Sequence, residues 1–249
     1  MLEKLAKQTA VYGISTIAVR FLSYLLTPVF TRVFEPEAYG IVTDVYALIP
    51  FALVVLTMGL ESAYFRFAAK ADAAAAAAGG TEGEIAAQAR AGKRRLFATA
   101  WGVTLLAASL FFLLTAFGRE RVAEWMGEAY VAHPEYVLLV AAVVWFDVAA
   151  CLPFSRLREQ GRAMTFVGIK ALGVVVNVAL AIGFALAGLY GTPFGVGWVF
   201  VANLIASAVK EPGLGERIAY AFMLKFVRDA KSLIISIFAL TFVLSLLIP

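Results

Sequence analysis

The sequence predicts an all-α membrane protein, a polytopic bundle of membrane-spanning helices whose N-terminus lies in the cytoplasm. Hydrophobic residues make up 62% of the 249 residues and charged residues only 15%. Soluble domains contain about 45–50% apolar and about 25% charged residues. The apolar residues form long runs, and each is close to the roughly 20 residues that cross a bilayer as a helix. The basic residues gather in the segments between these runs.

The apolar runs divide the chain into six spans and a weaker seventh. They cover residues 9–31, 40–68, 96–117, 136–154, 165–189, 193–209 and 232–248. The run 40–68 is longer than a bilayer requires, so we expect this helix to tilt or to protrude. We therefore expect residues 1–209 to form one six-span unit, and residues 210–249 to form an amphipathic linker and the weaker span.

The distribution of lysine and arginine sets the orientation. With the N-terminus inside, seventeen Lys and Arg side chains fall in cytoplasmic segments, three fall outside, and Arg20 lies within the first span. This asymmetry is the positive-inside pattern of membrane proteins. It explains the net charge of +4 without a nucleic-acid partner. We expect a multi-pass protein of the inner (cytoplasmic) membrane.

Two segments between the spans have distinct compositions. Residues 71–95 are alanine-rich and of low complexity, and we interpret them as a flexible cytoplasmic linker, with a short interfacial helix as the alternative. On the outer side, Glu120, Glu124 and Glu128 repeat every four residues within 118–135. That spacing is typical of an amphipathic surface helix with a solvated face.

The first span carries a small and polar face around an arginine. Successive spacings of three and four residues place one set of side chains on one side of a helix: Thr9, Gly13, Thr16, Arg20, Ser23 and Thr27. Arg20 is near the middle of the span, where a charge costs about 2.5–3.5 kcal/mol on insertion scales. We therefore predict that Arg20, Thr16, Ser23 and Tyr24 line a polar cavity. The alternative is an Arg–Glu pair that only fixes helix packing.

The second span contains a carboxylate and a cation that cannot neutralise each other. Glu61 and Arg66 are five residues apart, which is about 140° around a helix, so they are not an i,i+4 pair. Arg66 can reach the cytoplasmic surface, although we also include it among the cavity candidates. Glu61 needs a partner from another helix, and the sequence suggests Arg20.

Polar side chains also share faces in the later spans. Asp147, Cys151 and Arg158 form one set, Lys170, Gly173 and Asn177 a second, and Asn203, Ser207 and Lys210 a third. Polar residues deep in a membrane mark transport pathways by default, so we include Asp147, Asn177 and Asn203 in the predicted cavity. For each asparagine, a hydrogen bond that only packs two helices together is an equally good explanation.

The sequence contains no recognisable catalytic set, so we do not expect an enzyme. It has one histidine and one cysteine, and lacks the His-Glu-x-x-His, Gly-x-Ser-x-Gly and phosphate-loop motifs. A membrane-embedded sugar or acyl transferase is disfavoured because His133 is in an outside loop. We expect no cofactor. Carboxylates in the spans could serve proton or sodium coupling, and charge pairing explains them equally well.

Three stretches resemble one family of membrane proteins. They are "YGISTIAVRFLSYLLTPVFTRVFEPEAYGIVTDVYAL", "GLESAYFRFA" and "LPFSRLREQGRAMTFVGIK". Together they resemble the amino-terminal half of the polysaccharide-biosynthesis (Wzx-type) flippases of the multidrug and oligosaccharidyl-lipid exporter superfamily. The resemblance covers about residues 1–209 and implies one six-helix lobe of a MATE-like fold.

The resemblance also implies a function. Such a lobe would help to move an undecaprenyl-pyrophosphate-linked oligosaccharide from the cytoplasmic to the outer leaflet for polysaccharide or O-antigen biosynthesis. Family members use cationic cavity residues for the anionic pyrophosphate, and the matching positions here are Arg20 and Arg66. Its partners would be this lipid-linked oligosaccharide and the membrane lipids.

The sequence after about residue 209 departs from the family pattern. Family members carry a second lobe, and a single lobe cannot rock against itself. We expect a truncated gene product, with pairing to a second copy or to a separate lobe as the other explanation. A different class of function is a non-transporting membrane scaffold or assembly partner derived from such a lobe.

Overall fold

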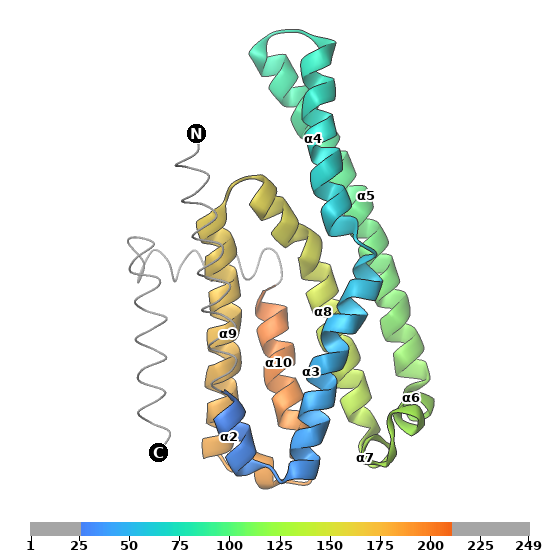
Figure 1. The fold of residues 1–249 in the computed structure, drawn as a ribbon, viewed down its shortest axis with the longest axis vertical. Coiled ribbons are helices and arrows are strands. Elements are labelled where there is room, and N and C mark those ends of the chain that lie inside the picture. The colour runs from blue at the N-terminus through green and yellow to red at the C-terminus, as the bar shows by residue number, and fades with distance from the viewer. Residues whose placement is uncertain (1–25, 211–249) are drawn as a thin grey trace.

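The structure, a computed structural model, describes residues 26–210. Every regular element of these residues is a helix, and the expectation of an all-α fold is confirmed for them (Figure 1). The helices are α2 (Leu26–Val33), α3 (Pro36–Thr57), α4 (Leu60–Ala78), α5 (Glu82–Phe117), α6 (Arg119–Met126), α7 (Glu128–Val131), α8 (Pro134–Glu159), α9 (Ala163–Leu186), the 3₁₀ turn η1 (Leu189–Gly191) and α10 (Gly197–Val209). The first span is represented only by its end, α2, and the seventh lies outside the described residues.

The long helices have the length and composition of membrane spans. Four candidate spans occur within the described part of the chain: Pro36–Ala78, Glu82–Phe117, Pro134–Glu159 and Ala163–Leu186. The shorter helix α10 is also apolar. Large apolar side chains cover much of the outer surface; Leu106 is 73% exposed and Leu186 is 85% exposed. An apolar surface this extensive indicates contact with lipid, so the chain is a multi-pass membrane protein.

Helix α8 is the centre of the bundle. It packs against α5, α10, α3, α4 and α9, and it is the most buried of the candidate spans. Val144 and Val148 of α8 are fully buried in the main apolar core, together with Val45 of α3 and Phe200 of α10. A polar side chain in the middle of α8 is therefore close to neighbouring helices.

We expect one continuous helix over the run 40–68, but the structure contains two. It is divided between α3 and α4 at Met58 and Gly59, whose φ angles are 49° and 67°. Two successive residues in the left-handed region cannot continue a right-handed helix. The carbonyl of Gly59 then accepts hydrogen bonds from the amides of Ser62 and Ala63 at 3.1 and 3.2 Å. The break places Glu61 in the first turn of α4.

The alanine-rich segment 71–95 is helical instead of being a flexible linker. It forms the end of α4 and the start of α5, joined by residues 79–81. Thr81 caps α5: its hydroxyl accepts from the amide of Glu84, and its own amide donates to the Glu84 carboxylate at 2.9 Å. This α4–α5 hairpin projects beyond the rest of the bundle (Figure 1). On the opposite end, the predicted surface helix in 118–135 is present as α6 and α7.

The α4–α5 hairpin is fixed to the bundle by a shared lysine. Lys93 Nζ lies 2.7 Å from a carboxylate oxygen of Asp72 on α4 and 2.7 Å from one of Glu159 at the end of α8. Trp101 of α5 also donates from Nε1 to the Ala149 carbonyl of α8 at 2.9 Å. These contacts join α4, α5 and α8 at the end of the bundle that the charge count places in the cytoplasm.

Candidate functional site

A cavity of about 330 Å³ lies between α3, α4, α8, α9 and the end of α10. Three cationic side chains and two carboxylates line it, together with apolar and aromatic residues. Its lining residues are Leu53, Glu61, Asp147, Ala150, Cys151, Phe154, Arg158, Phe166, Lys170, Val174 and Lys210. We call it the α8 cavity. Charged groups are rare within candidate spans because hydrocarbon does not solvate them, and they indicate a functional site by default.

Glu61 reaches the α8 cavity because the α3–α4 break ends one helix and starts another at that point. Its carboxylate forms an ion pair with the Arg158 guanidinium of α8. The second carboxylate oxygen of Glu61 accepts from the Cys151 thiol, with Sγ and Oε2 at 3.6 Å. The partner of Glu61 among the described residues is therefore Arg158. Arg20 lies outside the described residues, so its pairing with Glu61 stays a prediction.

Asp147 and Lys210 form the second ion pair of the α8 cavity. Lys210 Nζ lies 3.4 Å from Asp147 Oδ1. The stem of Lys210 crosses α9 at Gly173: a Cβ added to Gly173 would lie only 2.7 Å from Lys210 Cγ. The missing side chain at Gly173 therefore leaves the space through which Lys210 reaches Asp147.

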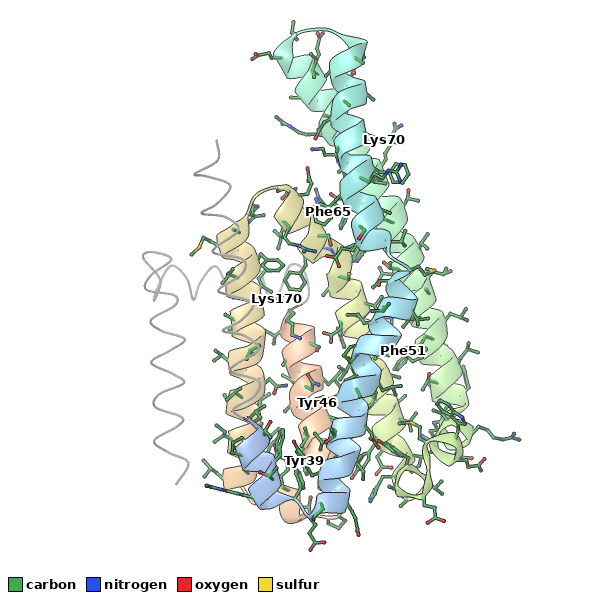
Figure 2. All side chains as sticks on the ribbon, in the orientation of Figure 1. Tyr39, Tyr46, Phe51, Phe65, Lys70 and Lys170 are labelled. Atoms are coloured by element: carbon green, nitrogen blue, oxygen red, sulfur yellow. The ribbon has the colours of Figure 1, made fainter. Side chains whose placement is uncertain are left out.

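Lys170 is the third cation, and aromatic rings surround its ammonium group. Nζ lies 5.4 Å from the ring centroid of Phe154 and 5.1 Å from that of Phe166. Within residues 26–210, no carboxylate is within ion-pair distance of this amine. Figure 2 shows Lys170 between α9 and α8. Cation–π contacts stabilise an ammonium group by about 0.5–2 kcal/mol but leave its charge uncompensated.

Phe166 connects Lys170 to the Glu61–Arg158 pair. The Arg158 guanidinium lies 5.7 Å from the Phe166 centroid and 5.2 Å from that of Phe65 on α4. Arg158 and Lys170 thus share one ring while only Arg158 is neutralised by a carboxylate. The described lining of the α8 cavity consequently has one cation more than it has carboxylates.

The remaining predicted site residues are distributed differently. Thr16, Arg20, Ser23 and Tyr24 lie outside the described residues. Arg66 is exposed on α4 and is not among the residues lining the α8 cavity, because it is about 140° around the helix from Glu61. Asn177 donates to Asn203 at 3.3 Å, which joins α9 to α10, and neither asparagine is among the residues lining the α8 cavity.

Sequence reasoning placed Asp147 and Glu61 in the site but omitted Arg158, Lys170 and Lys210. The signal was present, because Arg158 shares a helical face with Asp147, and Lys170 shares one with Asn177. What the sequence did not show is that these faces meet at one cavity.

Comparison with known proteins identifies the family of this chain. A family model described as "Polysaccharide biosynthesis protein" matches residues 5–247. The match continues well past residue 209, where we expected the resemblance to end. Neither the curated proteins nor the solved structures give a match. The match covers nearly the whole chain, and the chain therefore belongs to the polysaccharide biosynthesis protein family, which is Wzx- and MATE-like.

Proposed function

We propose that this chain takes part in moving an undecaprenyl-pyrophosphate-linked oligosaccharide from the cytoplasmic to the outer leaflet of the cell membrane. The single observation that carries the proposal is Lys170. It is a cation within a candidate span, on the wall of a cavity, and no carboxylate of the described residues lies within ion-pair distance of its amine. A site with surplus positive charge in a low-dielectric setting favours an anion, and the pyrophosphate of such a lipid is anionic.

The chemistry of the cavity suits a phosphate group that has an apolar lipid attached. Arg158 offers a planar guanidinium that can hold phosphate through two parallel hydrogen bonds, and Lys170 offers a compact point charge. Phe154 and Phe166 supply an apolar wall beside these cations. Family membership supports a transporter-like role over an enzymatic one.

The test is a translocation assay with the full chain in vesicles. An undecaprenyl pyrophosphate that carries a short fluorescent oligosaccharide is placed in the membrane, and its exposure is followed with a quencher that does not cross the bilayer. We expect the wild-type chain to move the fluorophore between leaflets. We expect Lys170→Met to slow the movement by about ten- to hundredfold, because hydrogen bonds to charged groups contribute about 1.5–3 kcal/mol.

Lys70→Met is the matched control. Lys70 is also a lysine above a phenylalanine ring, with Nζ 5.4 Å from the Phe67 centroid, but it lies on the projecting hairpin, away from the α8 cavity (Figure 2). Equal rates for the two variants would refute the role of Lys170. A wild-type chain that binds the lipid but does not move it would favour a scaffold.

A further inference from the structure

The projecting α4–α5 hairpin carries more positive than negative charge. Residues 62–95 contain six lysine and arginine side chains and three aspartate and glutamate side chains. One of these cations, Lys93, is already bound by Asp72 and Glu159. The arginines of the hairpin are all exposed, and none of them has a carboxylate of residues 26–210 within ion-pair distance. We call these four side chains the arginine belt: Arg66, Arg90, Arg94 and Arg95.

The arginine belt lies where the hairpin leaves the predicted membrane span. The apolar run of α5 starts at Leu96 and ends at Phe117. At 1.5 Å per residue the run is about 33 Å long, which is close to the roughly 30 Å of hydrocarbon in a bilayer. Arg94 and Arg95 come directly before the run, and Arg90 is about one helical turn further out. The three arginines of α5 therefore begin at the boundary of the hydrocarbon.

Arg66 lies at the same depth because α4 packs antiparallel against α5. Asp72 of α4 pairs with Lys93 of α5, and the ring centroid of Tyr64 lies 6.3 Å from that of Phe97. Arg66 falls between these two contacts along α4, and two of the belt arginines fall between them along α5. The packing of the hairpin thus brings cations of both helices to one level.

An exposed aromatic side chain accompanies the arginine belt. Phe67 follows Arg66 in α4 and is 49% exposed. Aromatic and basic side chains together are typical of helices that lie at a membrane surface, where the ring enters the boundary of the acyl chains and the cations face the headgroups. An acidic protein would match the charge equally well. The depth of the belt and the exposed ring favour a lipid surface.

We propose that the arginine belt binds the phosphate headgroups of anionic phospholipids in the cytoplasmic leaflet. The lysine and arginine count of the chain places this end of the bundle in the cytoplasm. Basic clusters next to a span attract anionic lipids on that side, and a guanidinium group can hold a phosphate through two parallel hydrogen bonds. Bound lipids would fix the depth of the hairpin in the membrane. The α8 cavity takes no part in this contact.

A fluorescent label next to the belt reports the lipids around it. The full chain carries Cys151→Ser, which removes its single cysteine, and Ala69→Cys, at an exposed position of α4, to which a nitrobenzoxadiazole group is attached. The chain is placed in phosphatidylcholine vesicles that contain a minor fraction of nitroxide-labelled phosphatidylglycerol or the same fraction of nitroxide-labelled phosphatidylcholine. We expect the phosphatidylglycerol to quench the label at a much lower fraction than the phosphatidylcholine does.

Two pairs of substitutions test the assignment to the arginines. Arg66→Gln with Arg94→Gln should reduce the preference for phosphatidylglycerol by about fivefold for each arginine, because each basic residue near an anionic surface contributes about 1 kcal/mol. Arg119→Gln with Arg121→Gln is the matched control: both arginines are exposed on α6, at the opposite end of the bundle, and the change in net charge is the same. Arg94→Gln alone gives the fivefold test if the double variant does not fold.

Four results would overturn the proposal. They are equal quenching by the two labelled lipids, a preference that survives the paired change in the belt, an equal loss in the α6 control, and a preference that persists in about 1 M salt, where exposed charges are screened within about 3 Å. Equal quenching would leave an acidic protein as the partner of the belt. Lys170→Met should leave the preference unchanged, so this test does not depend on transport.

Discussion

The Glu61–Arg158 ion pair leads to a sharp prediction about stability, because it joins α4 to α8 beside the helix break. Exposed ion pairs contribute about 0.2–1 kcal/mol, whereas removing one partner of a buried pair costs about 3–5 kcal/mol. The Arg158 and Glu61 side chains are 34% and 40% exposed, so they lie between these limits. We expect a coupling energy of about 1–2 kcal/mol.

The measurement is a double-mutant cycle on the full chain. Glu61→Gln, Arg158→Gln and the double variant are unfolded in mixed micelles with increasing dodecyl sulfate, and helical circular dichroism reports the free energy of unfolding. Each single variant leaves one charge without its partner, so the two single losses should add up to more than the loss in the double variant. The coupling should decrease with added salt, because a partly exposed pair is screened.

The sequence suggested a different partner, and the same experiment separates the two. A second cycle combines Glu61→Gln with Arg20→Gln. If Arg158 is the partner, residues without direct contact should show coupling below about 0.5 kcal/mol. Coupling of Glu61 to Arg20 of 1 kcal/mol or more, together with none to Arg158, would refute the assignment made from the structure.

Three other predictions concern the same region. Gly173→Ala should destabilise the protein by about 1 kcal/mol, because the new methyl group would displace Lys210. In Gly183→Ala, on the same helix, the new methyl group meets no atom within 4 Å and should stabilise the protein by up to about 1 kcal/mol. Unfolding in dodecyl sulfate measures both changes. Arg20→Ala should abolish export of the lipid-linked sugar with membrane insertion intact, and full export by this variant would remove Arg20 from the cavity. A thiol reagent should reach Cys151 from the cytoplasmic side, and labelling only from outside would reverse the predicted topology.

The four candidate spans of the described residues could be predicted because one physical quantity, the length of an apolar run, largely determines them. The break between α3 and α4 could not be predicted in the same way. Met58 and Gly59 interrupt the helix through their backbone conformation. The apolar run continues across them, and only Glu61 marks the break in the sequence. A carboxylate in the first turn of a helix is favoured by the exposed amides and the helix dipole. That preference gives Glu61 a second reason for its position.

The helical hairpin in 71–95 has a local signal in the sequence, at the start of α5. The sequence from Thr81 to Glu84 is a capping box, a pattern that starts helices, and Gly79 and Gly80 precede it with positive φ angles. The low-complexity composition suggested a flexible linker. Alanine, however, has the highest helix propensity, so the same composition also favours the helical alternative, and the structure contains helices here.

The α8 cavity was only partly predictable, because it depends on contacts between helices. Periodicity places Lys170 on the same face as Asn177, but it does not show that Phe154 of α8 and Phe166 of α9 lie beside its ammonium group. Asn177 is a cavity candidate because of its depth, with a packing hydrogen bond as the equal alternative, and in the structure it donates a hydrogen bond to Asn203. Depth in the membrane identifies polar side chains that need a partner, and the packing of the bundle decides which partner each one obtains.

The surplus charge at Lys170 should have opposite effects on stability and on binding. A cation within the membrane costs about 2.5–3.5 kcal/mol, and the two phenylalanine rings offset about 0.5–2 kcal/mol of it. Part of the cost therefore remains in the empty cavity and is removed when an anion binds. Lys170→Met should raise the free energy of unfolding of the empty protein by about 1 kcal/mol and, in the same protein, weaken the binding of inorganic pyrophosphate at least tenfold. If Lys170 had only a packing role, its substitution would lower the free energy of unfolding of the protein. A destabilised Lys170→Met variant with unchanged pyrophosphate affinity would therefore contradict the proposed site.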